Sequence, residues 1–262
     1  MLYNKWNKIE FVGGKLKKNY KLLIAYDGTR YSGWEAKPDN EMTIQGKLEN
    51  VLSKMAGESV KVIGAGRTDA GVHAKGMVAN VHIDSDVSVG EVMKYLNEYL
   101  PEDISVQDVV EASERFHSRY NAVGKTYCYT CYCGDGKPVF DRKYVYILDK
   151  QPDIEKMRQA ATYLIGEHDF ASFCGNKKMK KSTVREIDII DISSKAGYIR
   201  MTFHGNGFLQ HMVRILVGTL LEVGFHKRSE ESVKELLEIK DRSKAGFTAP
   251  AKGLCLEQVD YN

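Results

Sequence analysis

Apolar residues in the first half of the chain recur at spacings that alternate between strand and helix. Runs of strand length lie at 22–26, 60–64, 76–83 and 104–110. Between the first two runs, apolar residues from Ile44 to Met55 fall on one face of a helix that Thr43 can cap. A capping box, Ser88-Val-Gly-Glu91, opens a second helix that must stop before Pro101. The predicted order is β-α-β-β-α-β.

The second half of the chain repeats this order. We expect strands at 125–132, 186–192, 198–203 and 254–259, helices at 153–165 and 207–223, and an additional helix at 229–239. Two such split βαβ units are related to the ferredoxin-like and RNA-recognition architectures. The sequence therefore predicts an α/β fold of the α+β type, with two β-α-β-β-α-β lobes, mainly antiparallel sheets and a central cleft. The expected lobes are residues 1–115 and 116–262.

Composition is that of a soluble globular protein. The 262 residues are 43% hydrophobic and 28% charged, which argues against disorder. No apolar run has the length of a membrane span, and the N-terminus lacks the apolar core of a secretory signal, so we expect a cytoplasmic protein without membrane contact. Five cysteines, an odd number, favour a reduced compartment over a disulfide framework.

A metal site is a weak interpretation of the cluster Cys128, Cys131 and Cys133. The cluster lies in an alternating run, so Cys128 should face away from the other two. No second pair stands at zinc-ligand spacing. We therefore expect no metal.

Positive charge is modest overall but is gathered in places. The net charge is +3, and lysines concentrate in the first 21 residues and in a cluster at Lys177, Lys178, Lys180 and Lys181. Such runs can be solvated loops or contacts to nucleic-acid phosphates. Charge alone leaves both interpretations open.

One glycine-rich loop carries a carboxylate close to a guanidinium. The stretch Gly66-Arg67-Thr68-Asp69-Ala70-Gly71-Val72-His73 places Arg67 and Asp69 two residues apart, between two predicted strands. An aspartate in such a loop is often only a turn former. A dinucleotide fingerprint is excluded because Asp69 occupies the third glycine position, and a P-loop is excluded because no Lys-Ser/Thr follows.

The predicted helix at 207–223 contains a single arginine among apolar residues. Because the helix has almost no polar face, Arg214 should lie in a largely buried element and needs a carboxylate partner. A structural ion pair or a guanidinium that reaches solvent would satisfy the same constraint. The more specific hypothesis pairs Arg214 with Asp69.

Four strings together resemble the TruA family of tRNA pseudouridine synthases, from about Leu22 to Tyr261. They are the loop above, Arg115-Phe-His-Ser-Arg119, Asn206-Gly-Phe-Leu-Gln-His-Met-Val-Arg214, and Ala245-Gly-Phe-Thr-Ala-Pro-Ala-Lys-Gly-Leu254. The resemblance implies an isomerase that converts uridine to pseudouridine at sites 38 to 40 of the tRNA anticodon stem-loop. Asp69 would start cleavage of the N-glycosidic bond, with Arg214 paired to it in the active site. The resemblance further implies tRNA as partner, a homodimer, two sheets that run together, and no cofactor.

The resemblance also assigns binding residues. Tyr127 matches the tyrosine that stacks on the target base, and Arg67 matches the residue that takes the place of the extruded nucleotide. Histidines 73, 117 and 211 lie in the matched strings, where a structural hydrogen bond is the expected role. The chain departs from the family at Glu35-Ala36-Lys37, where glutamines are usual, and at Lys125-Thr126, where an arginine-rich pair is usual. These departures bear on RNA contacts.

Two alternatives to this function stay open at the level of sequence. A non-catalytic RNA-binding protein on the same scaffold would share the lobes and the basic patches, although the intact Asp69 and Arg214 argue against it. A pseudouridine synthase that acts on other RNA uridines would share the catalytic residues as well.

Overall fold

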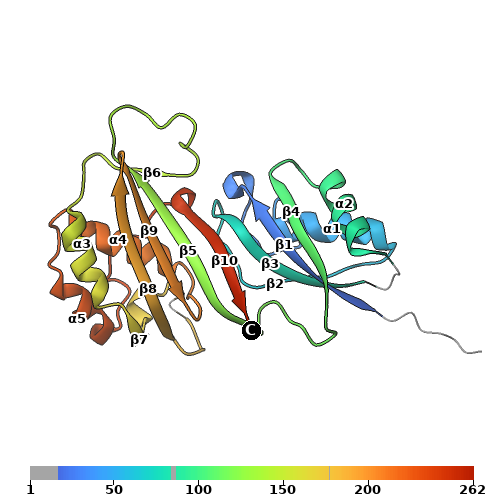
Figure 1. Ribbon diagram of the computed structural model, residues 1–262. Coiled ribbons are helices and arrows are strands. Elements are labelled where there is room, and N and C mark those ends of the chain that lie inside the picture. The colour runs from blue at the N-terminus through green and yellow to red at the C-terminus, as the bar shows by residue number, and fades with distance from the viewer. Residues whose placement is uncertain (1–16, 84–86, 177) are drawn as a thin grey trace, which may run out of the picture.

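The computed structural model describes residues 17–262 except 84–86 and 177. Within this part of the chain, ten strands join into one sheet (Figure 1). The main strand order is β4-β1-β3-β10-β5-β9-β8-β7, with β2 beside β3 and β6 beside β5. Apart from the β3–β10 and β5–β6 pairs, neighbouring strands run antiparallel. The predicted class, a mixed α/β fold with mainly antiparallel pairing, is confirmed.

The elements follow the predicted order closely. The first half contains β1 Lys18–Tyr26, α1 Ile44–Ala56, β2 Val62–Gly64, β3 His73–Ile83, α2 Val89–Tyr99 and β4 Ile104–Ala112. The second half contains β5 Ala122–Tyr132, β6 Tyr146–Ile147, α3 Ile154–Thr162, β7 Gly166–Asp169, β8 Val184–Lys195, β9 Tyr198–Gly205, α4 Met212–Gly224, α5 Glu231–Ile239 and β10 Leu254–Tyr261. Short 3-10 helices occur at Gly28–Arg30, Ala171–Phe173 and Ala251–Gly253.

Side-chain caps fix the starts of three helices. Thr43 accepts a hydrogen bond from the Gly46 N–H at the start of α1, and Asp153 caps α3 in the same way. At α2 the predicted capping box is complete, because Ser88 and Glu91 each accept from the other's backbone N–H. Within the described residues, no helix is both long enough and apolar enough to cross a membrane.

Helix α4 begins later than the apolar pattern predicts. The pattern placed its start at Gly207, but the helix begins at Met212 because His211 adopts the left-handed conformation with φ 61°. Residues 206–211 instead form a turn that leads from β9 into the helix. The apolar side chains of this turn, Phe208 and Leu209, line a cavity of the protein instead of a helix face.

Strand β10 joins the two halves of the sheet. It pairs in parallel with β3 through Cys255 and Leu256, and antiparallel with β5 over its whole length. Sequence analysis predicted β10 as the last strand of the second lobe, whereas the structure shares it between both halves (Figure 1). The division into lobes at residues 115 and 116 stays a prediction; it falls in the segment between β4 and β5.

The buried face of β10 gives a test of this joint. Leu256 is 1% exposed and is part of the apolar core. Leu256→Ala should lower the free energy of unfolding by about 2–5 kcal/mol. Removal of the buried side chain leaves a cavity in the core at the strand that joins the two halves of the sheet. Chemical denaturation monitored by circular dichroism measures the loss. Gln258→Ala, at an exposed position on the same strand, is the control and should change stability by about 0.5 kcal/mol or less. A loss of similar size in both variants would contradict a shared core at β10.

Candidate active site

A cavity of about 790 Å³ opens where the two halves of the sheet meet. Its lining comes from the loop between β2 and β3, from β5, and from the turn and first residues of α4, so both halves contribute. Asp69, Arg67, Tyr127 and Arg214 all line this cavity. The structure therefore brings all four sequence-predicted site residues together.

An ion pair between the two halves forms the centre of the cavity wall. Arg214 Nη1 lies 2.8 Å from Asp69 Oδ2 and donates a hydrogen bond to it. The other carboxylate oxygen, Oδ1, lies 3.4 Å from His211 Nε2. The Arg214 side chain is 16% exposed and that of Asp69 is 27% exposed. The carboxylate is thus held in one orientation by the guanidinium and still faces the open space.

Arg214 is fixed by the loop that precedes β10. Its Nε donates to the Ala249 carbonyl at 2.7 Å, and the Ala249 N–H donates back to the Arg214 carbonyl at 3.0 Å. Ala249 is completely buried. Ala249 belongs to the fourth string of the resemblance, and this contact gives that string a physical role.

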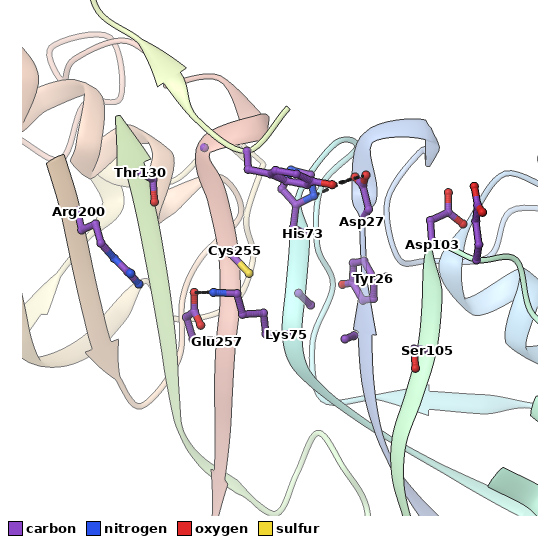
Figure 2. A pocket seen from close by; sticks show the side chains of 15 residues that line it. Tyr26, Asp27, His73, Lys75, Asp103, Ser105, Thr130, Arg200, Cys255 and Glu257 are labelled. Atoms are coloured by element: carbon purple, nitrogen blue, oxygen red, sulfur yellow. Dashed lines mark hydrogen bonds and ion pairs between the residues drawn. The ribbon is translucent and has the colours of Figure 1, made fainter. Parts of the chain in front are cut away.

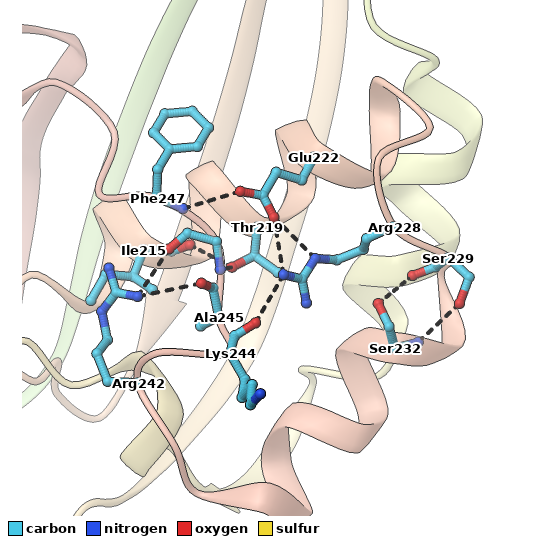
Figure 3. Close-up of polar contacts among 11 residues, drawn as sticks. Ile215, Thr219, Glu222, Arg228, Ser229, Ser232, Arg242, Lys244, Ala245 and Phe247 are labelled. Carbon is cyan, nitrogen blue, oxygen red and sulfur yellow. Dashed lines mark hydrogen bonds and ion pairs between the residues drawn. The ribbon is translucent and has the colours of Figure 1, made fainter.

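Polar contacts tie the same loop to α4 (Figure 3). The Gly246 N–H donates to Thr219 Oγ1 at 3.0 Å, and the Phe247 N–H donates to Glu222 Oε1 at 3.3 Å. Arg228 bridges Glu222 Oε2 and the Lys244 carbonyl. The position of the Ala249 carbonyl, and through it the direction of the Arg214 guanidinium, is therefore set by α4 itself.

The loop that carries Asp69 is held on both sides of the aspartate. The Thr68 carbonyl accepts from the Trp34 N–H at 3.1 Å, and the Thr68 hydroxyl shares a hydrogen bond of 2.8 Å with the buried Tyr26. After the aspartate, Gly71 turns the chain with φ 75°, a conformation that favours glycine. Its N–H donates to the Tyr31 carbonyl at 3.2 Å. Hydrogen bonds on both sides of Asp69 thus hold the turn that carries it in one conformation.

Tyr127 forms an aromatic wall beside the ion pair. Its side chain lies on β5, is 8% exposed, and packs edge to face on Phe208 with ring centroids 5.2 Å apart. Burial, and to a smaller extent the negative charge of Asp69, raise the pKa of Tyr127 above its usual range. The hydroxyl therefore keeps its proton, and the ring presents a neutral aromatic surface to the cavity.

Arg67 lies at the outer edge of the cavity and is paired. Its Nη2 is 2.5 Å from Glu35 Oε1, and the side chains are 62% and 45% exposed. Glu35 is one of the departures from the family pattern. The sequence alone did not predict this contact, because the two residues are far apart in the chain and neither is buried.

Three cations on the cavity wall were missed as site residues. Arg119, Lys125 and Arg185 line the cavity together with Lys37 and Lys181. Arg119 belongs to a quoted string, and Lys125 stands two residues before Tyr127 on the same strand, so its side chain must point to the same face. That spacing was the available signal for Lys125. No pattern in the sequence singles out Arg185.

The three histidines of the matched strings have different surroundings. His211 faces Asp69, as described above. His117 accepts from the backbone N–H groups of Arg119 and Tyr120 and stacks on the Tyr120 ring. His73 accepts from the Gly28 N–H at 3.1 Å, and burial lowers its pKa. His73 and His117 thus serve local structure.

His73 lines a second cavity, of about 410 Å³ (Figure 2). On β10, Cys255 and Glu257 line this second cavity, whereas Leu254 lines the first, so the two cavities lie on opposite faces of that strand. The hydroxyl of Tyr144 donates to Asp27 Oδ2 at 3.0 Å, and Lys75 pairs with Glu257 at 3.0 Å. These polar groups satisfy one another within the structure.

The remaining sequence features lie outside the cavity or outside the described residues. All five cysteines are free thiols. Of the lysine cluster, Lys181 lines the cavity, while Lys178 and Lys180 are exposed and do not. Lys177 and residues 1–16, which include three of the six lysines in the first 21 residues, lie outside the described residues.

Comparison with known proteins identifies relatives over nearly the whole chain. The family described as tRNA pseudouridine synthase matches residues 22–121 and 160–262. A tRNA pseudouridine synthase A from Bacillus sp. (strain KSM-64) is 50% identical over 243 residues, which cover 93% of this chain and 99% of that protein. A tRNA pseudouridine synthase A from Clostridium kluyveri is 48% identical over 244 residues, which cover 93% of this chain and all of that protein. A solved Cbf5-Nop10-Gar1 complex aligns at a TM-score of 0.34 with 13% identity, over 90% of this chain and 57% of that chain.

The contact between Asp69 and Arg214 can be tested by a double-mutant cycle. Arg214→Met should cost about 1–3 kcal/mol of stability, because it leaves a partly buried carboxylate without its donor. Asp69→Asn should also destabilise the protein, and the double variant should lose less than the sum of the two single losses. Urea denaturation of the four proteins measures these values. Additive losses would show that the two side chains do not interact.

Proposed function

The chain belongs to the tRNA pseudouridine synthase family, and we propose that Asp69 is the carboxylate with which it isomerises uridine to pseudouridine in tRNA. The observation that carries this proposal is the Asp69–Arg214 pair, 2.8 Å apart on the wall of a cavity that both halves of the protein line. The guanidinium fixes one carboxylate oxygen, the other lies 3.4 Å from His211 Nε2, and the group is still partly exposed to a ribose in the cavity. Active-site carboxylates need such a fixed direction toward the reacting atom.

The reaction is an internal rearrangement. The bond between N1 of uracil and C1′ of the ribose breaks, the base turns in the pocket, and C5 then bonds to C1′. The C5 proton leaves and N1 takes up a proton, so the product is an isomer of the substrate. Asp69 would act at the sugar, by attack on C1′ or by removal of a proton from C2′. The atoms balance without an external group, so we propose no cofactor.

The target nucleotide has to leave its stack before Asp69 can reach the ribose. An enzyme that acts on a base inside a stem extrudes the nucleotide and supplies a surface for the displaced base. Tyr127 would supply that surface, since its neutral ring lies beside Asp69. Arg67 would take the vacated place in the stem, because it is exposed at the outer edge of the same cavity.

Further properties follow from the family resemblance as proposals. We propose that the modified uridines are those at sites 38 to 40 of the anticodon stem-loop, that the protein is a homodimer, and that it works in the cytoplasm. Five free cysteines support a reduced compartment. The intact pair of Asp69 and Arg214 favours an enzyme over a non-catalytic RNA-binding protein.

Asp69→Asn should abolish pseudouridine formation and leave tRNA affinity within a few-fold of wild type. The substitution keeps the shape of the side chain and removes only the reactive oxygen and its charge, while many phosphate contacts carry the binding. Tritium release from tRNA labelled at C5 of uridine measures turnover, and filter binding measures affinity. Asp191→Asn, at an exposed position on β8, is the control and should leave both unchanged. Turnover of a tenth of wild type or more in Asp69→Asn would rule out Asp69 as the catalytic residue.

Glu35→Gln should raise tRNA affinity by about 1.4- to 5-fold. For Arg67 to enter the RNA, its ion pair with Glu35 has to break, and exposed pairs are worth about 0.2–1 kcal/mol. The gain should disappear when Glu35→Gln is combined with Arg67→Ala. Glu58→Gln, an exposed carboxylate outside the cavity, is the matched control. An equal gain in tRNA affinity with and without Arg67 would show that the negative charge of Glu35 repels the RNA directly and does not act through the ion pair with Arg67.

A further inference from the structure

Five cations line the wall of the central cavity without a carboxylate partner among the described residues, and three of them, Arg119, Lys125 and Arg185, lie close enough for the two arginines to act on the pKa of the lysine. Arg119 comes from the segment before β5, Lys125 from β5 and Arg185 from β8, and all three line the cavity. Among the ion pairs of the described residues, none includes any of the three. By contrast, Arg67 and Arg214 in the same cavity are each paired with a carboxylate. The three cations therefore leave an uncompensated positive charge beside the active site.

Two of these side chains are held in place by backbone groups. Lys125 Nζ donates to the Ala65 carbonyl at 2.9 Å, and Arg185 Nη1 donates to the Ser182 carbonyl at 3.1 Å. The lysine comes so close to the Asp69 loop that a Cβ on Gly66 would lie 3.1 Å from Nζ. A glycine at this position lets the ammonium approach the loop backbone. Two of the three charges are thus positioned by hydrogen bonds to the backbone.

The crowding of these charges has an electrostatic cost. Burial, and then the positive charges of Arg119 and Arg185, lower the pKa of Lys125 to about 8. A lysine held in such a place loses its proton more readily than a free one. An anion bound among the three groups would relieve this repulsion and restore the proton.

We infer that Arg119, Lys125 and Arg185 bind one phosphate group of the RNA strand next to the nucleotide that enters the active site. This inference rests on the proposed function, since it takes the cavity to hold RNA. Phosphate is the anionic group of an RNA strand, and three converging cations suit its oxygens. Lys125 and Tyr127 stand two residues apart on one face of β5, about 7 Å from each other. When a base stacks on Tyr127, the sugar-phosphate backbone of the same nucleotide therefore lies near Lys125.

The site makes RNA binding dependent on pH in a defined direction. Besides Arg119 and Arg185, the ionisable side chains that line the cavity with Lys125 are those of Glu35, Lys37, Arg67, Asp69, Tyr127, Lys181, His211 and Arg214. Bound phosphate favours protonated Lys125 and raises its pKa. Binding near pH 8 therefore takes up a proton at Lys125, and affinity falls as pH rises above about 8.

Proton uptake is the first measurement. Wild-type protein is titrated calorimetrically at pH 8 with tRNA that the enzyme has already modified to completion, in two buffers of different ionisation enthalpy. The wild type should take up about half a proton more than Lys125→Arg, because a pKa of about 8 leaves half of the lysines neutral and arginine stays charged. Lys125→Arg should otherwise bind well. Equal uptake in both proteins would overturn the inference.

Salt dependence is the second measurement. Lys125→Gln, Arg119→Gln and Arg185→Gln should each weaken binding and reduce the slope of log affinity against log salt, and the triple variant should reduce that slope by about 0.7 to 0.9 in total, the value for one phosphate contact. Lys54→Gln removes the same charge from an exposed position on α1, outside the cavity, and is the matched control. A slope equal to that of Lys54→Gln in all three variants would also overturn the inference.

The experiment separates failure of this site from failure of the proposed function. Tritium release by the wild type tests the function alone and does not depend on Lys125. An active wild type together with an unchanged slope in Lys125→Gln would reject the phosphate site and keep the function. An inactive wild type would reject the function, and the site with it.

Discussion

The structure of the site depends on one ion pair between elements that are far apart in the chain. Arg214 lies on a helix whose other side chains are largely buried, so its guanidinium cannot remain there without a partner. Asp69 meets that need from the opposite half of the protein. The same contact that compensates the buried charge also gives the carboxylate its direction. Stability and chemistry therefore place the same demand on these two residues.

Charged groups of both signs surround the Asp69–Arg214 pair in the cavity. Asp69 is surrounded by Arg214 and His211, an outer edge carries the pair of Arg67 and Glu35, and the unpaired cations lie on the wall beside Tyr127. A negative group at the centre suits work on a ribose, and positive groups around it suit the phosphates that accompany that ribose. The positive groups attract the phosphates of an RNA strand, and the negative charge of Asp69 repels phosphates from the centre of the cavity.

Sequence patterns predicted the elements well and their neighbours less well. Periodicity records which side of a strand is buried, so it located every long strand, but it does not say that β10 lies between β3 and β5. The apolar helix predicted only that Arg214 needs a carboxylate, and the family resemblance identified that carboxylate as Asp69. Glu35 with Arg67, and Arg185 beside Lys125, could not be predicted, since exposed charges carry no sign of their partners. The start of α4 was missed because the left-handed turn at His211 has no hydrophobic signature.

The central place of β10 has a consequence for how the protein is made. Residues 254–261 are synthesised after every other strand of the sheet, yet they fill the gap between its two halves. Before β10 is made, β3 and β5 lack the strand that joins them, so the cavity wall between the two halves cannot close. The Ala249 loop that directs Arg214 also emerges just before this strand. A chain that has been made only as far as residue 253 therefore has no assembled active site.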